Sequence, residues 1–377
     1  MTKKLINFAA LASIIFLQAC LFYPKLTIKG KGNIKLKQTD FESLSNWEND
    51  DHKKALQAFI QSCNKFSKMA QNRLVGGQIG DITAGDFHDV CEIANVVKTL
   101  SNRQAKNFFE NWFTPFLVEN RLGISKGLFT GYYEASLKGS KFKTEKFQYP
   151  IYARPKDLGT KPYLTRAEIE NGALTNQNLE ILYVDDKVEL FFMHIQGSGR
   201  VKMQDGSEVR VAYAGRNNQP FIAVSNFMVD KKLIERSTMS AATVKEWLKK
   251  NLDKADEVMN VNTAYTFFKI SDGEHVVGAQ NVPLTSERSL AVDNEIMTYG
   301  IPLWVETNLK KKDGSKEKYN HLFIAQDTGS AIKGTVRGDI FFGNGKEAEE
   351  KAFYMASPGE YYALLPISLV DKIRGYK

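Results

Sequence analysis

Residues 325–343 read AQDTGSAIKGTVRGDIFFG, the densest mixture of ionisable, turn-forming and apolar residues in the chain. Asp327 and Asp339 stand here with four glycines and two cations, and glycine-rich loops let the backbone approach a ligand closely. Asp339 lies between Gly338 and the apolar run 340–342. Because apolar surroundings disfavour the charged form, they raise the pKa of a carboxyl group and suit it to be a general acid. The alternative is that both aspartates cap turns, as Asp beside Gly commonly does.

Strand patterns continue on both sides of this segment. Short runs rich in aromatic and β-branched residues, separated by turn residues, predict strands at 131–133, 149–152, 188–192, 265–268, 303–305, 322–325 and 361–365. Asp205-Gly206 predicts a hairpin. The charged run 310–318 contains Asp313-Gly314, which predicts a second hairpin tip and not a binding patch.

Helical periodicity dominates the N-terminal part of the chain. Apolar residues recur at helical spacing over 55–66 and 87–97, and Ser101 with Gln104 forms a capping box before a third such stripe. One more helix is predicted at about 240–252. The whole pattern predicts an α+β protein, mainly β, with barrel-like β parts and N-terminal helices.

The first twenty residues carry an export pattern. Lys3 and Lys4 precede an apolar stretch over 5–17, which is typical of a secretory signal and short for a membrane span. The sequence Leu17-Gln18-Ala19-Cys20 then looks like a bacterial lipobox, although an ordinary signal peptide with a chance cysteine is the alternative. We therefore expect a signal peptide over 1–19, a lipid on Cys20 and a tether over 20–50. Leu21, where Asp would signal retention in enteric lipoproteins, favours the periplasmic face of the outer membrane.

Composition and charge narrow the possible partners. The 377 residues are 43% hydrophobic, which is enough for a packed core, and the net charge is +8. A basic exported protein suggests an anionic polymer such as peptidoglycan, whereas export argues against nucleic acid. Cys63 and Cys91 either form a disulfide in an oxidising compartment or remain as two buried thiols. The five histidines are scattered without metal-ligand spacing, so we expect no metal and no cofactor.

Four stretches carry a resemblance to a known family. They are 128–134 (LFTGYYE), 194–199 (HIQGSG) with 213–217 (YAGRN), 288–293 (RSLAVD) and the segment from Asp327 to Asp339. In this order, from about Phe87 onward, the chain resembles the membrane-bound lytic murein transglycosylase A family. The last two stretches also resemble the C-terminal module of that family, which carries three characteristic aspartates, here Asp293, Asp327 and Asp339.

The resemblance implies a fold and a domain division. It implies a double-psi β-barrel over 51–134 plus 276–377, joined to helices, with a second β domain inserted over 135–275. A groove between the two would hold a glycan strand. The family motif reads His-Phe-Asp in some members, where this chain has Arg337-Gly338-Asp339.

The resemblance also implies an activity and roles for single residues. Asp339 would be the only acid/base in cleavage of the β-1,4 bond between N-acetylmuramic acid and N-acetylglucosamine, with a 1,6-anhydro product. Asp327, Asp293 and Thr130 would support it, although pure barrel structure is the alternative for the two aspartates. Gln196, Ser198 and Asn217 are candidate hydrogen-bonding partners of the sugars, with simple turn roles as the alternative. Tyr132 and Tyr133 are candidates for stacking on sugar rings, and strand alternation should turn one of this pair into the core.

Two other functions stay open at this point. One is a peptidoglycan hydrolase that uses two carboxylates, Asp339 with Asp327 or Glu134. The other is an expansin-like protein that binds the cell wall without cleaving it. The expected partners are glycan strands and, through the lipid, a membrane; protein partners and the choice between cleavage at strand ends and within strands stay open.

Overall fold

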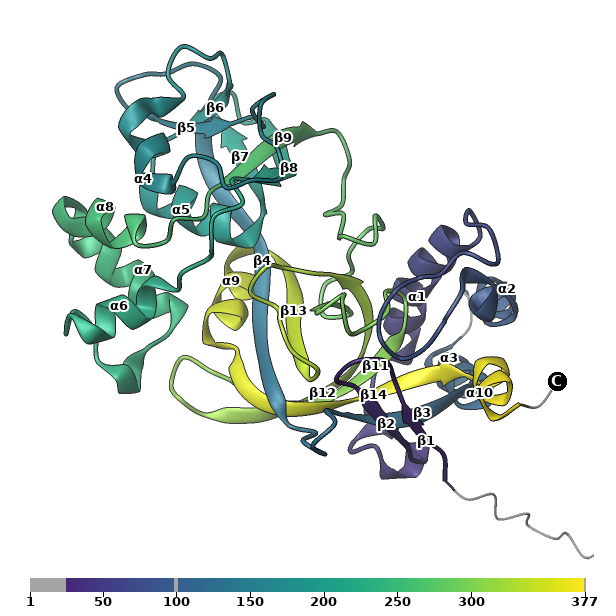
Figure 1. Ribbon diagram of the computed structural model, residues 1–377. Helices are drawn as coiled ribbons and strands as arrows, with labels where there is room; N and C mark the ends of the chain where they lie inside the picture. The colour runs from purple at the N-terminus through teal and green to yellow at the C-terminus, as the bar shows by residue number, and fades with distance from the viewer. Residues whose placement is uncertain (1–24, 98–100, 376–377) are drawn as a thin grey trace, which may run out of the picture.

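The structure is a computed structural model that describes residues 25–97 and 101–375 (Figure 1). The predicted signal peptide and the lipidated Cys20 lie outside the described residues. None of the helices in the described part of the chain combines the length and the apolar character needed to cross a membrane.

The described strands join into one fourteen-stranded sheet that forms two units (Figure 1). In the first unit, the strand path β14-β11-β12-β10-β13-β4 closes on itself, because β4 also pairs with β14. This closed barrel contains two parallel pairs, β10 with β12 and β13 with β4. Its strands, with the N-terminal strands that extend it, are β1 (Thr27–Lys29), β2 (Lys35–Gln38), β3 (Phe113–Glu119), β4 (Gly127–Ser140), β10 (Ser289–Val292), β11 (Pro302–Lys310), β12 (Lys316–Asp327), β13 (Arg337–Asn344) and β14 (Ala356–Pro366).

The long strand β4 connects the barrel to the second unit (Figure 1). Its first half pairs with β13, and from Ala135 onward it pairs with β7 instead. The second unit is a smaller sheet made of the end of β4 with β5 (Tyr149–Tyr152), β6 (Glu180–Val184), β7 (Ser198–Met203), β8 (Glu208–Arg216) and β9 (Thr266–Ser271). Since one strand belongs to both sheets, it fixes the position of one unit against the other.

Helices cover the ends and faces of both units (Figure 1). They are α1 (His52–Phe66), α2 (His88–Val97), α3 (Asn102–Trp112), α4 (Arg166–Glu168), α5 (Lys187–Gln196), α6 (Val224–Asp230), α7 (Ala241–Lys250), α8 (Leu252–Asn260), α9 (Gly345–Tyr354) and α10 (Ile367–Arg374). Short turns of helix are η1 (Phe41–Ser43), η2 (Trp47–Asn49), η3 (Ala84–Phe87), η4 (Ile169–Ala173) and η5 (Arg236–Thr238). The capping box of Ser101 and Gln104 begins α3 as predicted. Cys63 of α1 and Cys91 of α2 form a disulfide, so the thiol alternative is wrong.

The prediction of a tether over 20–50 is wrong for its described part, residues 25–50. β1 pairs with β2, and β2 adds to the sheet beside β3. Trp47 is buried against Trp304 of the barrel. Asp50 is also buried, and it accepts hydrogen bonds from Arg288 and from the backbone N–H of Leu322. The segment is polar in composition, but a few apolar anchors and one buried carboxylate bind it to the barrel.

The strand predicted at 188–192 is also wrong, because these residues belong to helix α5. Asp186 accepts hydrogen bonds from the N–H groups of Val188 and Glu189 and caps the helix. Gly197 ends it with a φ of +84°, a conformation that glycine adopts without a steric penalty. The helix is buried on several sides, so its sequence lacks the single apolar stripe that identifies surface helices. The helix predicted at 240–252 is α7, and the hairpins at Asp205-Gly206 and over 310–318 are confirmed.

Candidate active site

Strand register places four side chains in one row across the barrel. Asp327 on β12 pairs with Ala291 on β10, Ala291 pairs with Asp339 on β13, and Asp339 pairs with Thr130 on β4. Paired residues of neighbouring strands point to the same side of a sheet. Residues that are far apart in the chain are thereby gathered on the outer face of the barrel, with Ala291 separating the two carboxyl groups.

Strand alternation determines which neighbours share this face. Successive side chains point to opposite sides of a strand, so Arg337 and Phe341 point the same way as Asp339. On β4, Thr130 and Tyr132 lie on that side, and the ring centroid of Tyr132 is 5.2 Å from that of Phe341. Gly338 faces the barrel interior, where a Cβ atom would lie 2.8 Å from the ring of Phe129. The close packing of Phe129 therefore explains the glycine beside Asp339.

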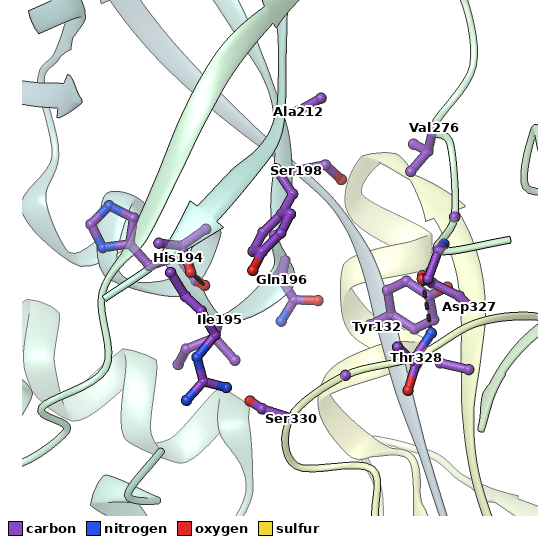
Figure 2. A pocket seen from close by; sticks show the side chains of 18 of the residues that line it. Tyr132, His194, Ile195, Gln196, Ser198, Ala212, Val276, Asp327, Thr328 and Ser330 are labelled. Atoms are coloured by element: carbon purple, nitrogen blue, oxygen red, sulfur yellow. Dashed lines mark hydrogen bonds between the residues drawn. The ribbon is translucent and has the colours of Figure 1, made fainter. Parts of the chain in front are cut away.

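Three residues of this row, Asp327, Ala291 and Asp339, line one wall of a cavity of about 510 Å³ between the two units. Tyr132, Asp327 and Asp339 line it on the barrel side. Gln196 and Ser198 line it on the side of the second sheet, and Figure 2 shows these two residues across the cavity from Tyr132 and Asp327. Ala291 also lines the cavity, where its small side chain leaves room between the two aspartates.

Asp339 is half-buried, and the groups around it shift its pKa in opposite directions. Burial raises its pKa above the usual Asp value, and the nearby charge of Asp327 acts in the same direction. The charge of Arg337 and a hydrogen bond from Thr130 act against this rise. The Thr130 hydroxyl donates to Oδ1 of Asp339 at 2.5 Å. The net result is a carboxyl that holds its proton to higher pH than a free Asp.

Asp327 is held by three donors. The Tyr132 hydroxyl donates to its Oδ2 at 2.7 Å, and the backbone N–H groups of Ala279 and Thr328 donate to its Oδ1 at 2.9 Å each. Burial raises the pKa of Asp327, and these donors oppose that rise. Burial and the charge of Asp327 raise the pKa of Tyr132 well above its usual value, so this hydroxyl stays protonated and keeps donating.

Asp293 lies outside the cavity and supports a loop. Its Oδ2 accepts from the backbone N–H of Gly334 at 2.9 Å, and its Oδ1 is 3.3 Å from Nζ of Lys333. These contacts fix the loop between β12 and β13, which carries Thr328 and Ser330 into the cavity wall.

Two of the residues predicted to bind sugar are placed elsewhere. Tyr133 is 3% exposed and packs against Phe353 in the core, which is the inward position that alternation predicted for one of the two tyrosines. Asn217 is fully buried: its amide donates to the carbonyls of Leu164 and Thr263, and its oxygen accepts from the N–H of Tyr265. Each polar group of its side chain already has a partner within the fold. The prediction that Tyr133 and Asn217 contact the sugar is therefore wrong.

Sequence reasoning missed three residues of this site. Ala291, Arg337 and Tyr213 all stand within the motif stretches, and alternation from Asp339 could have drawn attention to Arg337. Tyr213 lines the cavity and is 52% exposed, an unusual position for an aromatic ring. Residues 25–97 and 101–375 contain no group of three or more His, Cys, Asp or Glu that could hold a metal ion.

Comparisons with known proteins agree with this geometry. The family model described as MltA specific insert domain matches residues 128–269, and the 3D domain model matches residues 288–365. The membrane-bound lytic murein transglycosylase A of Escherichia coli (strain K12) is 32% identical over 323 residues, which are 79% of this chain and 86% of that protein. The Vibrio cholerae protein of the same name is 34% identical over 242 residues, which are 63% of this chain and 65% of that protein, just under two thirds of its length.

Solved structures give the same result for the fold. The membrane-bound lytic murein transglycosylase of Agrobacterium tumefaciens superimposes with a TM-score of 0.80 at 30% identity, over 91% of this chain and 99% of that one. The Escherichia coli MltA structure with bound chitohexaose has a TM-score of 0.69 at 23% identity, over 91% of this chain and 92% of that one, and supports the fold alone. The closed barrel is thus the double-psi β-barrel that the resemblance implied. From its sequence relatives and its fold together, the chain belongs to the membrane-bound lytic murein transglycosylase A family.

Proposed function

We propose that this protein, a peptidoglycan lytic transglycosylase by its family, cleaves the β-1,4 bond between N-acetylmuramic acid and N-acetylglucosamine with Asp339 as its only acid/base. The observation that carries the proposal is the position of Asp339. Its half-buried carboxyl, with a raised pKa, lines the cavity between the two units.

In the first step, Asp339 is protonated and gives its proton to the glycosidic oxygen. The bond between this oxygen and C1 of the muramoyl sugar breaks, and the N-acetylglucosamine side leaves as an alcohol. Positive charge develops on the muramoyl ring, close to the carboxylate that Asp339 has now become. A positioned acid of this kind contributes roughly 10²–10⁴-fold to the rate.

In the second step, the muramoyl C6 hydroxyl attacks C1 and Asp339 takes back a proton from that hydroxyl. The product is a 1,6-anhydro sugar, no water is consumed and the carboxyl is restored. An attacking group on the same molecule has an effective concentration on the order of 10⁵ M or more when it is well oriented. A second carboxylate that activates water is therefore unnecessary.

The two carboxyl groups that a hydrolase could combine with Asp339 are poorly suited to act as its nucleophile or base. Asp327 is two strands away across Ala291, which corresponds to roughly 10 Å between backbones, more than the roughly 5 Å between carboxyl groups that a nucleophile needs. Three donors already bind the oxygens of Asp327, which makes it a weaker base for a water molecule. Glu134 is fully buried between Arg200 and Arg210, at 2.6 and 2.8 Å. These contacts favour a lyase over a hydrolase that uses two carboxylates.

Asp327, Asp293 and Thr130 are proposed as supports and Tyr132, Gln196 and Ser198 as substrate contacts. Asp327 orients Tyr132, Asp293 orients the loop before β13, and Thr130 holds Asp339. Chitohexaose, a chain of related amino sugars, is bound in the Escherichia coli MltA structure. A glycan strand in the cavity of this protein would contact both units at once.

The proposal includes a location and a domain division. We place the protein on the periplasmic face of the outer membrane, anchored by a lipid on Cys20. Six residues separate Cys20 from β1 at Thr27, so the barrel would sit within roughly 25 Å of the lipid. Mass spectrometry of the N-terminal peptide tests the lipid, with Cys20→Ser as the variant. We retain 51–134 plus 276–377 as the barrel domain, now extended by the folded residues 25–50, and 135–275 as the insert.

The activity is tested by mass spectrometry of peptidoglycan digested with the wild type, Asp339→Asn or Asp313→Asn. The expected result is release of anhydro-muropeptides by the wild type and by Asp313→Asn, a matched change on the exposed β11–β12 hairpin. Asp339→Asn should lose at least 10²-fold in rate while still binding the glycan. Reducing ends in place of anhydro ends would identify a hydrolase, and binding without any release by the wild type would identify an expansin-like protein.

A further inference from the structure

We infer that Arg337 is a positioning residue which, through Thr130, determines which carboxyl oxygen of Asp339 carries the catalytic proton. This inference rests on the proposed role of Asp339 as acid and base. It is carried by the direction of the hydrogen bonds that join the three residues.

The register of β13 and β4 brings Arg337 to Thr130. Arg337 precedes Asp339 by two residues and pairs with Leu128, while Asp339 pairs with Thr130. The Arg337 side chain therefore lies diagonally opposite Thr130 on the same face, a spacing that a long side chain can reach. Nη2 of Arg337 donates to Oγ1 of Thr130 at 2.8 Å, and its Nη1 donates to the carbonyl of Gly338 at 2.5 Å and that of Leu128 at 3.3 Å.

The chemistry of these groups sets the direction of the chain of hydrogen bonds. A guanidinium group only donates, so Oγ1 of Thr130 must accept from Arg337. The single hydroxyl proton of Thr130 is then directed to Oδ1 of Asp339, 2.5 Å away. The nearby positive charge of Arg337 further disfavours a proton on that oxygen. Oδ1 is therefore the acceptor of this bond whether Asp339 is protonated or ionised.

The acidic proton is consequently left on Oδ2, the oxygen that this chain of bonds does not occupy. Asp339 lines the cavity, and its Oδ1 is bound by the Thr130 hydroxyl on strand β4. Oδ1 thus faces strand β4 and Oδ2 is the oxygen available to the substrate. The same arrangement serves both steps, because Oδ2 first gives the proton to the glycosidic oxygen and then receives the proton of the C6 hydroxyl.

The planar guanidinium group of arginine, with several N–H donors, suits this role better than the single ammonium group of lysine. Arg337 donates to a hydroxyl and to two backbone carbonyls at once, which fixes its plane. A lysine keeps the charge but not this planar group. Besides Arg337, the charged and titratable groups that face Asp339 are Asp327 on β12 and Tyr132 on β4.

The test measures kcat, KM and the pH profile of anhydro-muropeptide release for four single variants and one double variant. Arg337→Met should lower kcat about tenfold and leave KM within about twofold, because the acid is misoriented but the cavity is intact. Its alkaline limb should move to higher pH, since Arg337 holds the pKa of Asp339 down. Thr130→Val should do the same, because Thr130 donates to the charged form. Thr130→Ser, which keeps the hydroxyl donor, should recover most of the rate that Thr130→Val loses, and Arg337→Lys should lose rate with a smaller shift of the alkaline limb.

The double variant Arg337→Met/Thr130→Val separates a relay from two independent effects. If Arg337 acts through Thr130, the kcat of the double variant should be about the same as that of the less active single variant. If the two residues act independently, their two tenfold losses should multiply to a loss of about a hundredfold. Arg337→Met with unchanged kcat and pH profile would overturn the inference. So would a loss of rate with an unmoved alkaline limb and a lowered melting temperature, which would mark Arg337 as merely structural. An active Asp339→Asn would instead sink the proposed function, so the two failures are distinguishable.

Discussion

Replacing the buried carboxylate of Asp50 gives the sharpest test of whether residues 25–50 are packed onto the barrel and stabilise it. Its side chain is completely buried, and it accepts from Nη2 of Arg288 at 2.9 Å, from Nδ1 of His321 at 2.7 Å and from the N–H of Leu322 at 2.9 Å. Asp50→Asn keeps the shape but leaves the buried Arg288 without its anionic partner. Breaking a buried pair in this way destabilises a protein by about 3–5 kcal/mol.

This loss can be converted into a melting temperature. The entropy of unfolding is about 2.1 cal/mol/K per residue, hence about 0.7 kcal/mol/K for roughly 350 ordered residues. We therefore expect Asp50→Asn to lower the melting temperature by about 4–7 °C. The assay is thermal unfolding followed by calorimetry. Its matched control is Asp51→Asn, which should change little because Asn caps α1 about as well as Asp.

The pH dependence of the same variant follows from the lowered pKa of Asp50. Burial alone would raise this pKa, but the hydrogen bond from His321 and the charge of Arg288 outweigh it. A carboxyl whose pKa is lower in the folded state stabilises the fold above its unfolded pKa and loses that effect as the pH falls through the folded value. The gap between wild type and Asp50→Asn should thus stay constant down to about pH 5 and close only below the usual Asp value of 3.8. A change of less than 1 °C in the melting temperature at pH 7 would refute the conclusion that Asp50 attaches residues 25–50 to the barrel, and would favour the predicted tether.

Two further predictions concern the active-site side. Because burial raises the pKa of Asp339, ionising this carboxyl in the folded state costs stability at pH values above the usual Asp value. Asp339→Asn should therefore be more stable than the wild type at pH 7, and the difference should close as the pH falls below the usual Asp value of 3.8. Calorimetry at pH 7 and at low pH checks this, and a destabilised variant at pH 7 would contradict it. Asn217→Ala should lower the free energy of unfolding by about 2 kcal/mol or more, because the backbone groups of Leu164, Thr263 and Tyr265 lose their hydrogen bonds, and it should leave the KM of the folded enzyme unchanged. Ser198→Ala, in the cavity wall, should raise KM without changing stability. Urea unfolding and steady-state kinetics check both variants, and a raised KM for Asn217→Ala without a similar effect of Ser198→Ala would show that Asn217 contacts the substrate.

Residues that are neighbours within one motif stretch have different tasks in the structure. Arg288, Ala291 and Asp293 stand within six residues of sequence, yet they bind the N-terminal segment, line the cavity and hold a loop, in that order. Within the pair Tyr132 and Tyr133, one ring faces the cavity and its neighbour fills the core. Sequence proximity therefore says little about which of these residues meets the substrate.

Much of this protein follows from its sequence alone. Local patterns are sufficient for the capped helices, for the turn-bounded strands except the one predicted at 188–192, and for the two hairpins, because caps, turns and alternation act between residues that are close in the chain. The order of the motif stretches was enough to indicate the family and its barrel, and the apolar neighbours of Asp339 made it a candidate acid, a role that stays a proposal.

Only the tertiary structure decided which residues meet. The row Asp327, Ala291, Asp339 and Thr130 exists because strands from distant parts of the chain pair in one register, and a register shift of one residue would turn each of them to the opposite face. The burial of Asn217 and the attachment of residues 25–50 likewise depend on partners far along the chain. A side chain's role is set by the groups that surround it in space, and no local pattern contains them.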